Sequence, residues 1–252
     1  MNEFKELLLS LLKILPEEPM TYEEATRYFQ DKLEVTPKEF YALHAKYRSL
    51  AFTVSGYTAA RVISEFHEEL QRAIEEGTSM GDFKSHMDDF LERKGLHKLH
   101  PIQAETIFRT NVQTAYNVGA YKEMTSPAVM AARPYWRYDA VEDSRTRPSH
   151  LAMNGRVFPA DSPVWDTWYP PNGYKCRCSI STLSKRQVEQ QGLEVEEKIP
   201  DRVDIGYGYI HVMPDKDFHY NPAKVTFDPD LENMPESLQK AFERRQQDSP
   251  QE

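Results

Sequence analysis

Apolar side chains recur at intervals of three and four through the first hundred residues, which is the spacing of amphipathic helices. The segment 59–76 puts four large apolar residues on one stripe, and Gly77 follows it as a left-handed helix stop. The next segment, 80–94, repeats the pattern between Ser79, a residue type that caps helix starts, and Gly95. We therefore expect two amphipathic packing helices here.

Two capping boxes mark further helix starts. In this motif the cap residue and the third helical residue each accept, at the side chain, a hydrogen bond from the other's backbone amide. Thr21 with Glu24 and Thr36 with Glu39 have the required spacing, and Pro37 suits a first helical turn. The sequence predicts one helix after Thr21 and another after Thr36.

The pattern changes in the middle of the chain. The segment 102–124 predicts a long helix that is less amphipathic, because polar residues interrupt its apolar positions. From Pro127 onward Pro, Gly, Trp and Tyr become dense and the periodicity shortens, which indicates a compact α+β module. Short strands are expected at 135–138, 156–158 and 177–182, and a short helix from Ser184 onward.

These patterns predict an α+β fold in three parts. Residues 1–100 form a predominantly helical N-terminal region, and residues 101–192 form a small α+β module with short strands. Residues 193–252 are charged, rich in Pro, Asp and Glu, and poor in apolar residues. Such a composition buries too little apolar surface to fold by itself, so we expect a flexible C-terminal tail, extended or partly disordered.

Composition argues against a membrane protein. The mean hydropathy is −0.70, and the most apolar stretch, 7–15, falls short of the roughly 20 apolar residues of a spanning helix. This stretch also ends without a small-residue cleavage site, so we expect no signal peptide. The two cysteines, Cys176 and Cys178, are separated by a single residue, which makes a mutual disulfide strained. The expected compartment is therefore the cytoplasm.

The net charge of −9 argues against a chain that wraps nucleic acid with its whole surface, because such binding requires Lys and Arg to neutralise phosphates. The charge is uneven, however, since residues 133–186 hold nine Lys or Arg against five Asp or Glu. A basic face that contacts DNA is one interpretation of Arg147, Arg156 and Lys175. A solvated basic surface is the other.

Metal-ligating side chains gather in the same module. Cys176 and Cys178 supply two thiolates, His150 an imidazole and Asp143 a carboxylate, which together form a four-ligand set of the kind that holds structural zinc. A single intervening residue is tighter than the usual spacing of zinc cysteines, so the spacing alone is a weak signal. The alternative is a pair of reduced core cysteines.

The same residues allow two other interpretations. With Asp143 and His150 as acid and base, the thiol of Cys176 or Cys178 could serve as a nucleophile, provided that the base lies within hydrogen-bonding reach. Otherwise the segment 143–147 is a plain turn, whose Asp and Ser accept bonds from the local backbone. The neighbouring loop is aromatic and rich in proline, and it either packs the module or docks a partner: Trp165, Trp168, Tyr169, Pro170 and Pro171.

Several motifs follow one another in a fixed order. The first are Glu-Thr-Ile-Phe-Arg-Thr-Asn-Val-Gln-Thr-Ala-Tyr at 105–116, Tyr-Trp-Arg-Tyr at 135–138 and Asp-Ser-Arg-Thr-Arg-Pro-Ser-His at 143–150. They are followed by Asn-Gly-Arg-Val-Phe at 154–158, Tyr-Pro-Pro-Asn-Gly-Tyr-Lys-Cys-Arg-Cys at 169–178 and Pro-Asp-Lys-Asp-Phe-His-Tyr-Asn-Pro at 214–222. In these motifs the chain resembles the phage Mu F-like minor head proteins, also called the phage head morphogenesis family. The resemblance covers the chain from Pro19 to Pro222.

One position departs from the family pattern, since Asp217 stands where we expect a glycine before the aromatic residue, in the turn of the tail. The resemblance implies that the Asp, His and Cys positions are shared motif positions. It implies the same for a further set that shapes the module: Arg145, Thr146, Gly155, Pro170, Pro171, Asn172, Gly173 and Arg177.

The resemblance implies a minor head protein of a tailed bacteriophage or prophage, which acts near the portal in head assembly and in DNA packaging or ejection. Its partners would be the portal and other capsid proteins, together with double-stranded phage DNA. It would be assembled in the host cytoplasm and end in the virion. The expected role is structural, so we expect no enzyme, and no cofactor beyond a structural zinc ion.

The alternative is an enzyme or a toxin-like effector that uses Asp143, His150, Cys176 and Cys178. Some relatives of the module are fused to toxin domains. Here fewer than eighty residues follow Cys178, and they have little hydrophobic content, which is too little for a further catalytic domain. An effector activity would therefore have to reside in the module itself.

Overall fold

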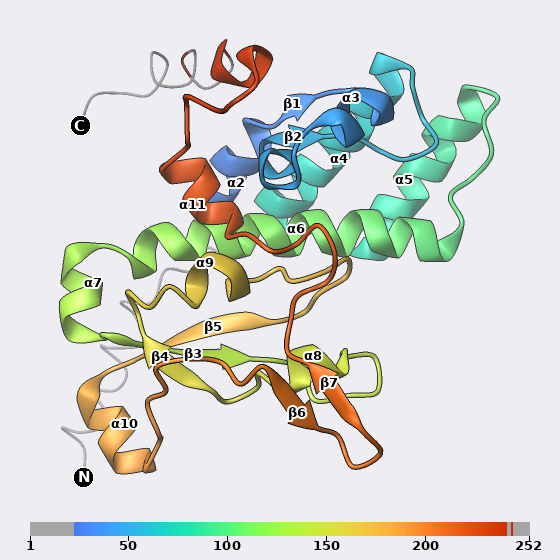
Figure 1. The fold of residues 1–252 in the computed structure, drawn as a ribbon. Coiled ribbons are helices and arrows are strands. Elements are labelled where there is room, and N and C mark those ends of the chain that lie inside the picture. The colour runs from blue at the N-terminus through green and yellow to red at the C-terminus, as the bar shows by residue number, and fades with distance from the viewer. Residues whose placement is uncertain (1–22, 241–242, 244–252) are drawn as a thin grey trace, which may run out of the picture.

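A long central helix divides the fold into two layers. The structure, a computed structural model, describes residues 23–240 and 243. Helix α6 (Pro101–Met124) runs through the middle, with the N-terminal helices on one side and the sheet of the module on the other (Figure 1). The predicted long helix, 102–124, is confirmed.

The N-terminal layer is helical, as the spacing of its apolar residues predicts. Thr36 accepts a hydrogen bond from the amide of Glu39, and Ser79 caps the next predicted start, so both caps are confirmed. Gly77 ends its helix with φ of 70°. The predicted cap Thr21 lies outside the described residues. The elements of this layer are α2 (Glu23–Gln30), β1 (Leu33–Glu34), α3 (Pro37–Ala42), the 3₁₀ helix η1 (Ala45–Leu50), β2 (Ala51–Phe52), α4 (Ala60–Glu76) and α5 (Met80–Arg93).

The layer is held to α6 by close helix packing. All four residues of the predicted stripe on α4 are buried: Val62, Phe66, Leu70 and Ile74. The closest approach is between α2 and α6, where a Cβ placed on Gly119 would lie 2.8 Å from the backbone nitrogen of Ala25. Because real Cβ atoms essentially never come this close to backbone, only glycine lets the two helices touch here.

The module contains a three-stranded antiparallel sheet in the order β4-β3-β5. The central strand alternates as a half-buried strand should, with Trp136 and Tyr138 facing the core. All three strands expected from the sequence are present, each shifted by no more than two residues. The elements are α7 (Pro127–Ala132), β3 (Tyr135–Asp139), α8 (Pro148–Leu151), β4 (Val157–Pro159), α9 (Trp165–Trp168), β5 (Ser179–Leu183) and α10 (Lys185–Gln191).

The C-terminal segment differs from the extended or partly disordered tail that its composition predicts. It forms an antiparallel hairpin, β6 (Arg202–Asp204) with β7 (Tyr209–His211), and the helix α11 (Pro222–Phe227), which packs on α6. Composition is an average over the segment, whereas the packing depends on single buried anchors at Val212, Phe218 and Ala223. Asn221 caps α11 and also donates to the carbonyl of Trp165 at 3.0 Å, which fastens the segment to the module.

One continuous core joins the two layers and the C-terminal segment. It extends from Ala25 in α2 to Ala223 in α11, and it includes both cysteines. Within the described residues, no helix has the length and hydropathy that a membrane span requires. The mostly helical N-terminal part, with small antiparallel sheets after it, confirms the predicted α+β fold.

We expect Gly119→Ala to destabilise the protein by about 1–3 kcal/mol, because the added Cβ would force α2 away from α6. Gly81→Ala in α5 is the matched control, since its Cβ would meet only the Ser79 hydroxyl, at 3.4 Å. The control should be neutral or slightly stabilising, because alanine favours a helix over glycine. Urea unfolding followed by circular dichroism measures both variants, and equal stabilities would contradict the close packing of α2 on α6.

Candidate metal centre

Three of the four residues predicted to bind zinc meet in one buried group. His150 lies on α8, and Cys176 and Cys178 lie in the segment that leads into β5. Nδ1 of His150 is 3.8 Å from Sγ of Cys176 and 3.6 Å from Sγ of Cys178. The three ligand atoms lie within 4.8 Å of one another, and all three residues are buried. We call these residues the His–Cys–Cys group.

The distances in this group suit a tetrahedral metal ion. Zinc binds nitrogen at about 2.0 Å and sulfur at about 2.3 Å, which leaves the two donor atoms about 3.6 Å apart at a tetrahedral angle. Both nitrogen-to-sulfur distances are close to this value, so the group could hold a metal ion with little movement. Among the described residues, no further His, Cys, Asp or Glu completes the set, and a fourth ligand would have to be of another kind.

The two thiols differ in acidity. A hydrogen bond from the Cys178 thiol holds the pKa of Cys176 well below its ordinary value, and His150 adds to this effect. The same contact, together with burial, raises the pKa of Cys178. The two sulfurs are therefore not equivalent, because the thiol proton of Cys178 is directed to Sγ of Cys176. Because metal ligands must be deprotonated, a bound cation would displace this proton.

His150 is oriented by an aromatic ring. Its imidazole meets Trp168 edge to face, with ring centroids 6.1 Å apart. The other ring nitrogen, Nε2, is buried and has no hydrogen-bond partner among residues 23–240 and 243. Metal-binding histidines usually donate this second N–H to a carboxylate or carbonyl. The group thus has the donors of a metal site, while the usual support of the imidazole is not found in the described part of the chain.

Polar residues of α6 hold the cysteine segment from behind. Asn117 donates from Nδ2 to the backbone carbonyl of Cys178 at 3.4 Å. The backbone carbonyl of Asn117 accepts from the hydroxyl of Tyr169 at 2.7 Å. The hydroxyl of Thr110 accepts from the backbone amide of Lys175 at 3.0 Å. These contacts explain why α6 is less amphipathic than the preceding helices, because part of its polar face is used against the module.

A buried tyrosine positions the loop before the cysteines. The hydroxyl of Tyr138 in β3 donates to Oδ1 of Asn172 at 2.8 Å, and both side chains are fully buried. Burial raises the pKa of Tyr138 well above its ordinary value, so the hydroxyl keeps its proton and remains a donor. The carbonyl of Asn172 accepts from the amide of Asp215 at 2.9 Å. The peptide bond between Pro170 and Pro171 in this loop is cis.

Asp143, the fourth predicted ligand, does not join the group. Its carboxylate accepts from the guanidinium of Arg177 at 2.8 Å, and this ion pair holds the pKa of Asp143 well below its ordinary value. The carboxylate also accepts from the backbone amide of Arg145 at 3.0 Å, as in the plain turn that the sequence allowed. The four-ligand hypothesis is thus reduced to three residues, because Arg177, between the two cysteines, engages the carboxylate.

The remaining motif residues shape the backbone around the group. Thr146 donates its hydroxyl to a backbone carbonyl of the same turn. Gly155 has φ of 78°, a left-handed conformation that favours glycine. Gly173 lies directly against the side chains of Asp215 and Arg147, so that a Cβ at this position would clash with Asp215 and crowd Arg147.

The residues predicted to contact DNA are mostly neutralised by acidic neighbours. Arg147 pairs with Asp215 at 2.8 Å, and Arg156 pairs with Glu196 at 2.5 Å. Lys175 is half-buried and has a left-handed backbone with φ of 58°. Two of these three residues are thus paired with a carboxylate, and their contact with DNA stays a prediction.

The residues that support the His–Cys–Cys group were not predicted from the sequence. The alternation of the strand 135–138 was the available signal for Tyr138, since it places this residue on the inner face with Trp136. For Asn117 the only signal was an amide in a weakly amphipathic helix. No local pattern connects Asn117 with Cys178, which lies 61 positions away.

Comparison with known proteins relates the chain to Mu-like phages. The family described as Phage Mu protein F like protein matches residues 64–181, a range that includes the His–Cys–Cys group. The protein named capsid assembly protein F of Escherichia phage Mu is 30% identical over 244 residues, covering 82% of this chain and 55% of that protein. The Mu-like prophage FluMu F protein of Haemophilus influenzae is 36% identical over 157 residues, covering 58% of this chain and 37% of that protein.

The chain therefore spans about half, or less, of the length of these two relatives. No solved structure matches the chain significantly.

We expect Asn172→Ala to cost about 1–3 kcal/mol of stability, because it leaves the buried hydroxyl of Tyr138 without its acceptor. Tyr138→Phe should have a cost of similar size, since it leaves the buried Oδ1 of Asn172 without its donor. In the double variant the two costs should fall short of additive by about 1 kcal/mol, the net value of the hydrogen bond. Urea unfolding of the four proteins measures this coupling, and strictly additive costs would show that the bond does not position the loop.

Proposed function

Because the chain belongs to the phage Mu protein F-like family, we propose that it is a head assembly protein of a tailed phage or prophage. The observation that carries this proposal is the similarity to the capsid assembly protein of phage Mu, which extends over 82% of this chain. An alignment that covers 82% of the chain must include residues of both layers. The proposal therefore concerns the whole folded body, and the His–Cys–Cys group is one part of it.

The finer role that we propose is that of a minor head protein near the portal. There it would contact the portal and other capsid proteins during assembly in the host cytoplasm, remain in the virion, and assist DNA packaging or ejection. The order of the motifs from 105 to 222, which resembles that of minor head proteins, supports this role. The continuous core supports it too, because a body of fixed shape suits a component of a particle.

In this proposal the main partners are the portal and other capsid proteins, and contact with DNA is secondary. Arg147 and Arg156 are each engaged by a carboxylate, so contact with a phosphate would first have to break an ion pair. Binding to duplex DNA through such residues would weaken steeply with salt. We therefore propose that the protein comes near DNA because of its place in the particle, and not because these two arginines bind phosphates.

We propose further that the His–Cys–Cys group holds a structural zinc ion and is not a catalytic centre. His150, Cys176 and Cys178 are 1%, 2% and 1% exposed, so a substrate has no access to the thiols or the imidazole. Zinc at this place would connect α8 to the segment before β5. It would thus join the motif at 143–150, which contains His150, to the motif at 169–178, which contains both cysteines. The enzyme alternative would require an open site around these residues.

A phage or prophage from which this chain is deleted should fail to form normal heads, and the full chain supplied from a plasmid should restore them. Electron microscopy of lysates provides the measurement. Immunogold labelling of purified particles tests the finer role, for which we expect a signal at a single vertex. Normal heads in the deletion would refute the assembly role, whereas label distributed over the whole capsid would refute the place at the portal.

Purified full-length protein should contain stoichiometric zinc by mass spectrometry, and removal of the metal with a chelator should lower its melting temperature. Cys178→Ser should lose the metal, because it removes one of three ligands. Asp143→Asn is the matched control and should keep it, because the carboxylate of Asp143 is bound by Arg177. Wild-type protein free of metal would end the zinc hypothesis, and loss of zinc from Asp143→Asn would restore the four-ligand site.

A further inference from the structure

The hairpin of β6 and β7 carries the two most exposed large hydrophobic side chains of the described residues. Tyr207, at the tip, is 86% exposed, and Tyr209, at the start of β7, is 73% exposed. The hairpin extends from the module in the direction away from α6 (Figure 1). Aromatic side chains gathered at one exposed place are typical of a contact with another protein.

The tip of the hairpin is held in one conformation by its own hydrogen bonds. The amide of Ile205 donates to the carbonyl of Gly208 at 2.9 Å, and the amide of Gly206 donates to Oδ1 of Asp204 at 2.8 Å. Because the turn around Tyr207 is already ordered, little conformational entropy is lost when this side chain is bound. Asp204 forms no ion pair with any of the described residues, so the tip carries a negative charge beside its aromatic rings.

A groove of about 600 Å³ lies on another part of the surface. It is formed by the start of η1 and by the segment 213–220, which connects β7 to α11. Its apolar lining includes Met213, Pro214 and Tyr220, and Met213 is 50% exposed. A cavity of about 150 Å³ in another protein binds benzene, so this groove has room for an aromatic side chain.

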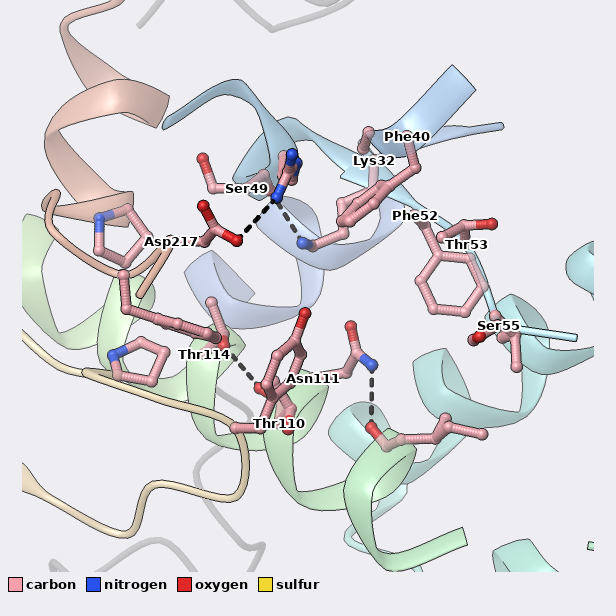
Figure 2. A pocket seen from close by; sticks show the side chains of 18 of the residues that line it. Lys32, Phe40, Ser49, Phe52, Thr53, Ser55, Thr110, Asn111, Thr114 and Asp217 are labelled. Atoms are coloured by element: carbon pink, nitrogen blue, oxygen red, sulfur yellow. Dashed lines mark hydrogen bonds and ion pairs between the residues drawn. The ribbon is translucent and has the colours of Figure 1, made fainter. Parts of the chain in front are cut away.

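Lys216 gives this groove a positive charge. Its two acidic neighbours in the sequence are both engaged by arginines, since Asp215 pairs with Arg147 at 2.8 Å and Asp217 pairs with Arg48 at 3.4 Å. Figure 2 shows the carboxylate of Asp217 with its ion pair drawn as a dashed line. Lys216 is exposed and forms no ion pair within residues 23–240 and 243, so its charge remains open to a partner.

The tip cannot fill the groove of its own chain. The strand β7 lies between Tyr207 and Met213, and at about 3.3 Å per residue it holds the two roughly 20 Å apart. The hairpin points away from α6, whereas the segment after β7 runs past α6 toward α11 (Figure 1). A tip that enters such a groove must therefore come from a second molecule.

We propose that the hairpin tip of one copy of this chain binds in the groove of a second copy. Tyr207 packs on the apolar lining of that groove, and Asp204 lies near its Lys216, so that both the apolar surfaces and the charges are complementary. Because the tip and the groove are different surfaces, each copy can join two others, and contacts of this kind close into a ring or continue as a fibre. The inference goes beyond the assembly role, and its test can fail while that role stands.

Sedimentation velocity of the full chain over a concentration series provides the first test. The wild type should self-associate as its concentration rises. Tyr207→Ser and Lys216→Glu should each weaken this association by about tenfold or more, because the first removes the aromatic anchor and the second places a like charge opposite Asp204. Circular dichroism should show both variants folded, since both side chains are exposed.

A mixing experiment tests whether the tip and the groove meet each other. Tyr207→Ser keeps an intact groove, and Lys216→Glu keeps an intact tip. An equal mixture of the two variants should therefore form a one-to-one dimer at a concentration where neither variant associates alone. Asp204→Lys combined with Lys216→Glu in one chain should restore self-association, because the two charges are exchanged.

Two matched controls change the same kinds of side chain elsewhere. Ile102→Ser removes an apolar side chain that is 61% exposed, and Lys185→Glu reverses the charge of an exposed lysine on α10. Neither residue lies on the hairpin or lines the groove, so both variants should associate like the wild type.

Four results would each overturn the proposal. A wild type that stays monomeric at near-millimolar concentration would leave the groove to a different partner. Association that is unchanged in Tyr207→Ser or in Lys216→Glu would place the contact elsewhere. A mixture of these variants that forms no dimer would show that the tip and the groove do not meet, and an exchange of charges that fails to restore association would separate Asp204 from Lys216.

Discussion

Helix α6 packs against the helical layer on one side and against the module on the other, and the rest of the structure depends on this double contact. On one side Gly119 admits α2 to backbone contact, which brings the helical layer against it. On the other side Asn117 and Thr110 hold the segment that carries the cysteines. A helix with one solvated face could not do both, and this is why its sequence shows neither a clean apolar stripe nor a charged face. The positions of both layers, and of α11 across the helix, follow from this arrangement.

Most of the fold could be predicted from the sequence, because most of it depends on local rules. The cap at Thr36 and the stop at Gly77 depend on residues within one helical turn, and the strand around Trp136 and Tyr138 depends on simple alternation. The C-terminal segment could not be predicted in this way. Its anchors, Val212 among them, are single residues whose burial depends on distant partners, and composition does not record such pairs.

The candidate site was predictable in its chemistry but not in its exact membership. His150, Cys176 and Cys178 are residue types that bind metals, and the structure brings them together. Asp143 has the right chemistry as well, yet its carboxylate accepts from the guanidinium of Arg177, the residue between the two cysteines. Spacing does not reveal which of two partners a charged side chain prefers, because that choice depends on distances in space. A cavity of about 180 Å³ between the N-terminal layer, α6 and the C-terminal segment (Figure 2) was invisible for the same reason, since Lys32 and Asp217, which both line it, stand near opposite ends of the described chain.

The loop between the cis proline and β5 borders the cavity at its start and carries both cysteines of the His–Cys–Cys group at its end. Pro171 and Tyr174 form part of the cavity wall, whereas Cys176 and Cys178 belong to the buried thiol cluster, and only Lys175 separates the two sets. So short a stretch of backbone cannot be ordered at one end and left free at the other. A metal ion at the thiols would therefore restrain backbone that also borders the cavity, and any coupling between the two places would be equal in both directions, as thermodynamic reciprocity requires.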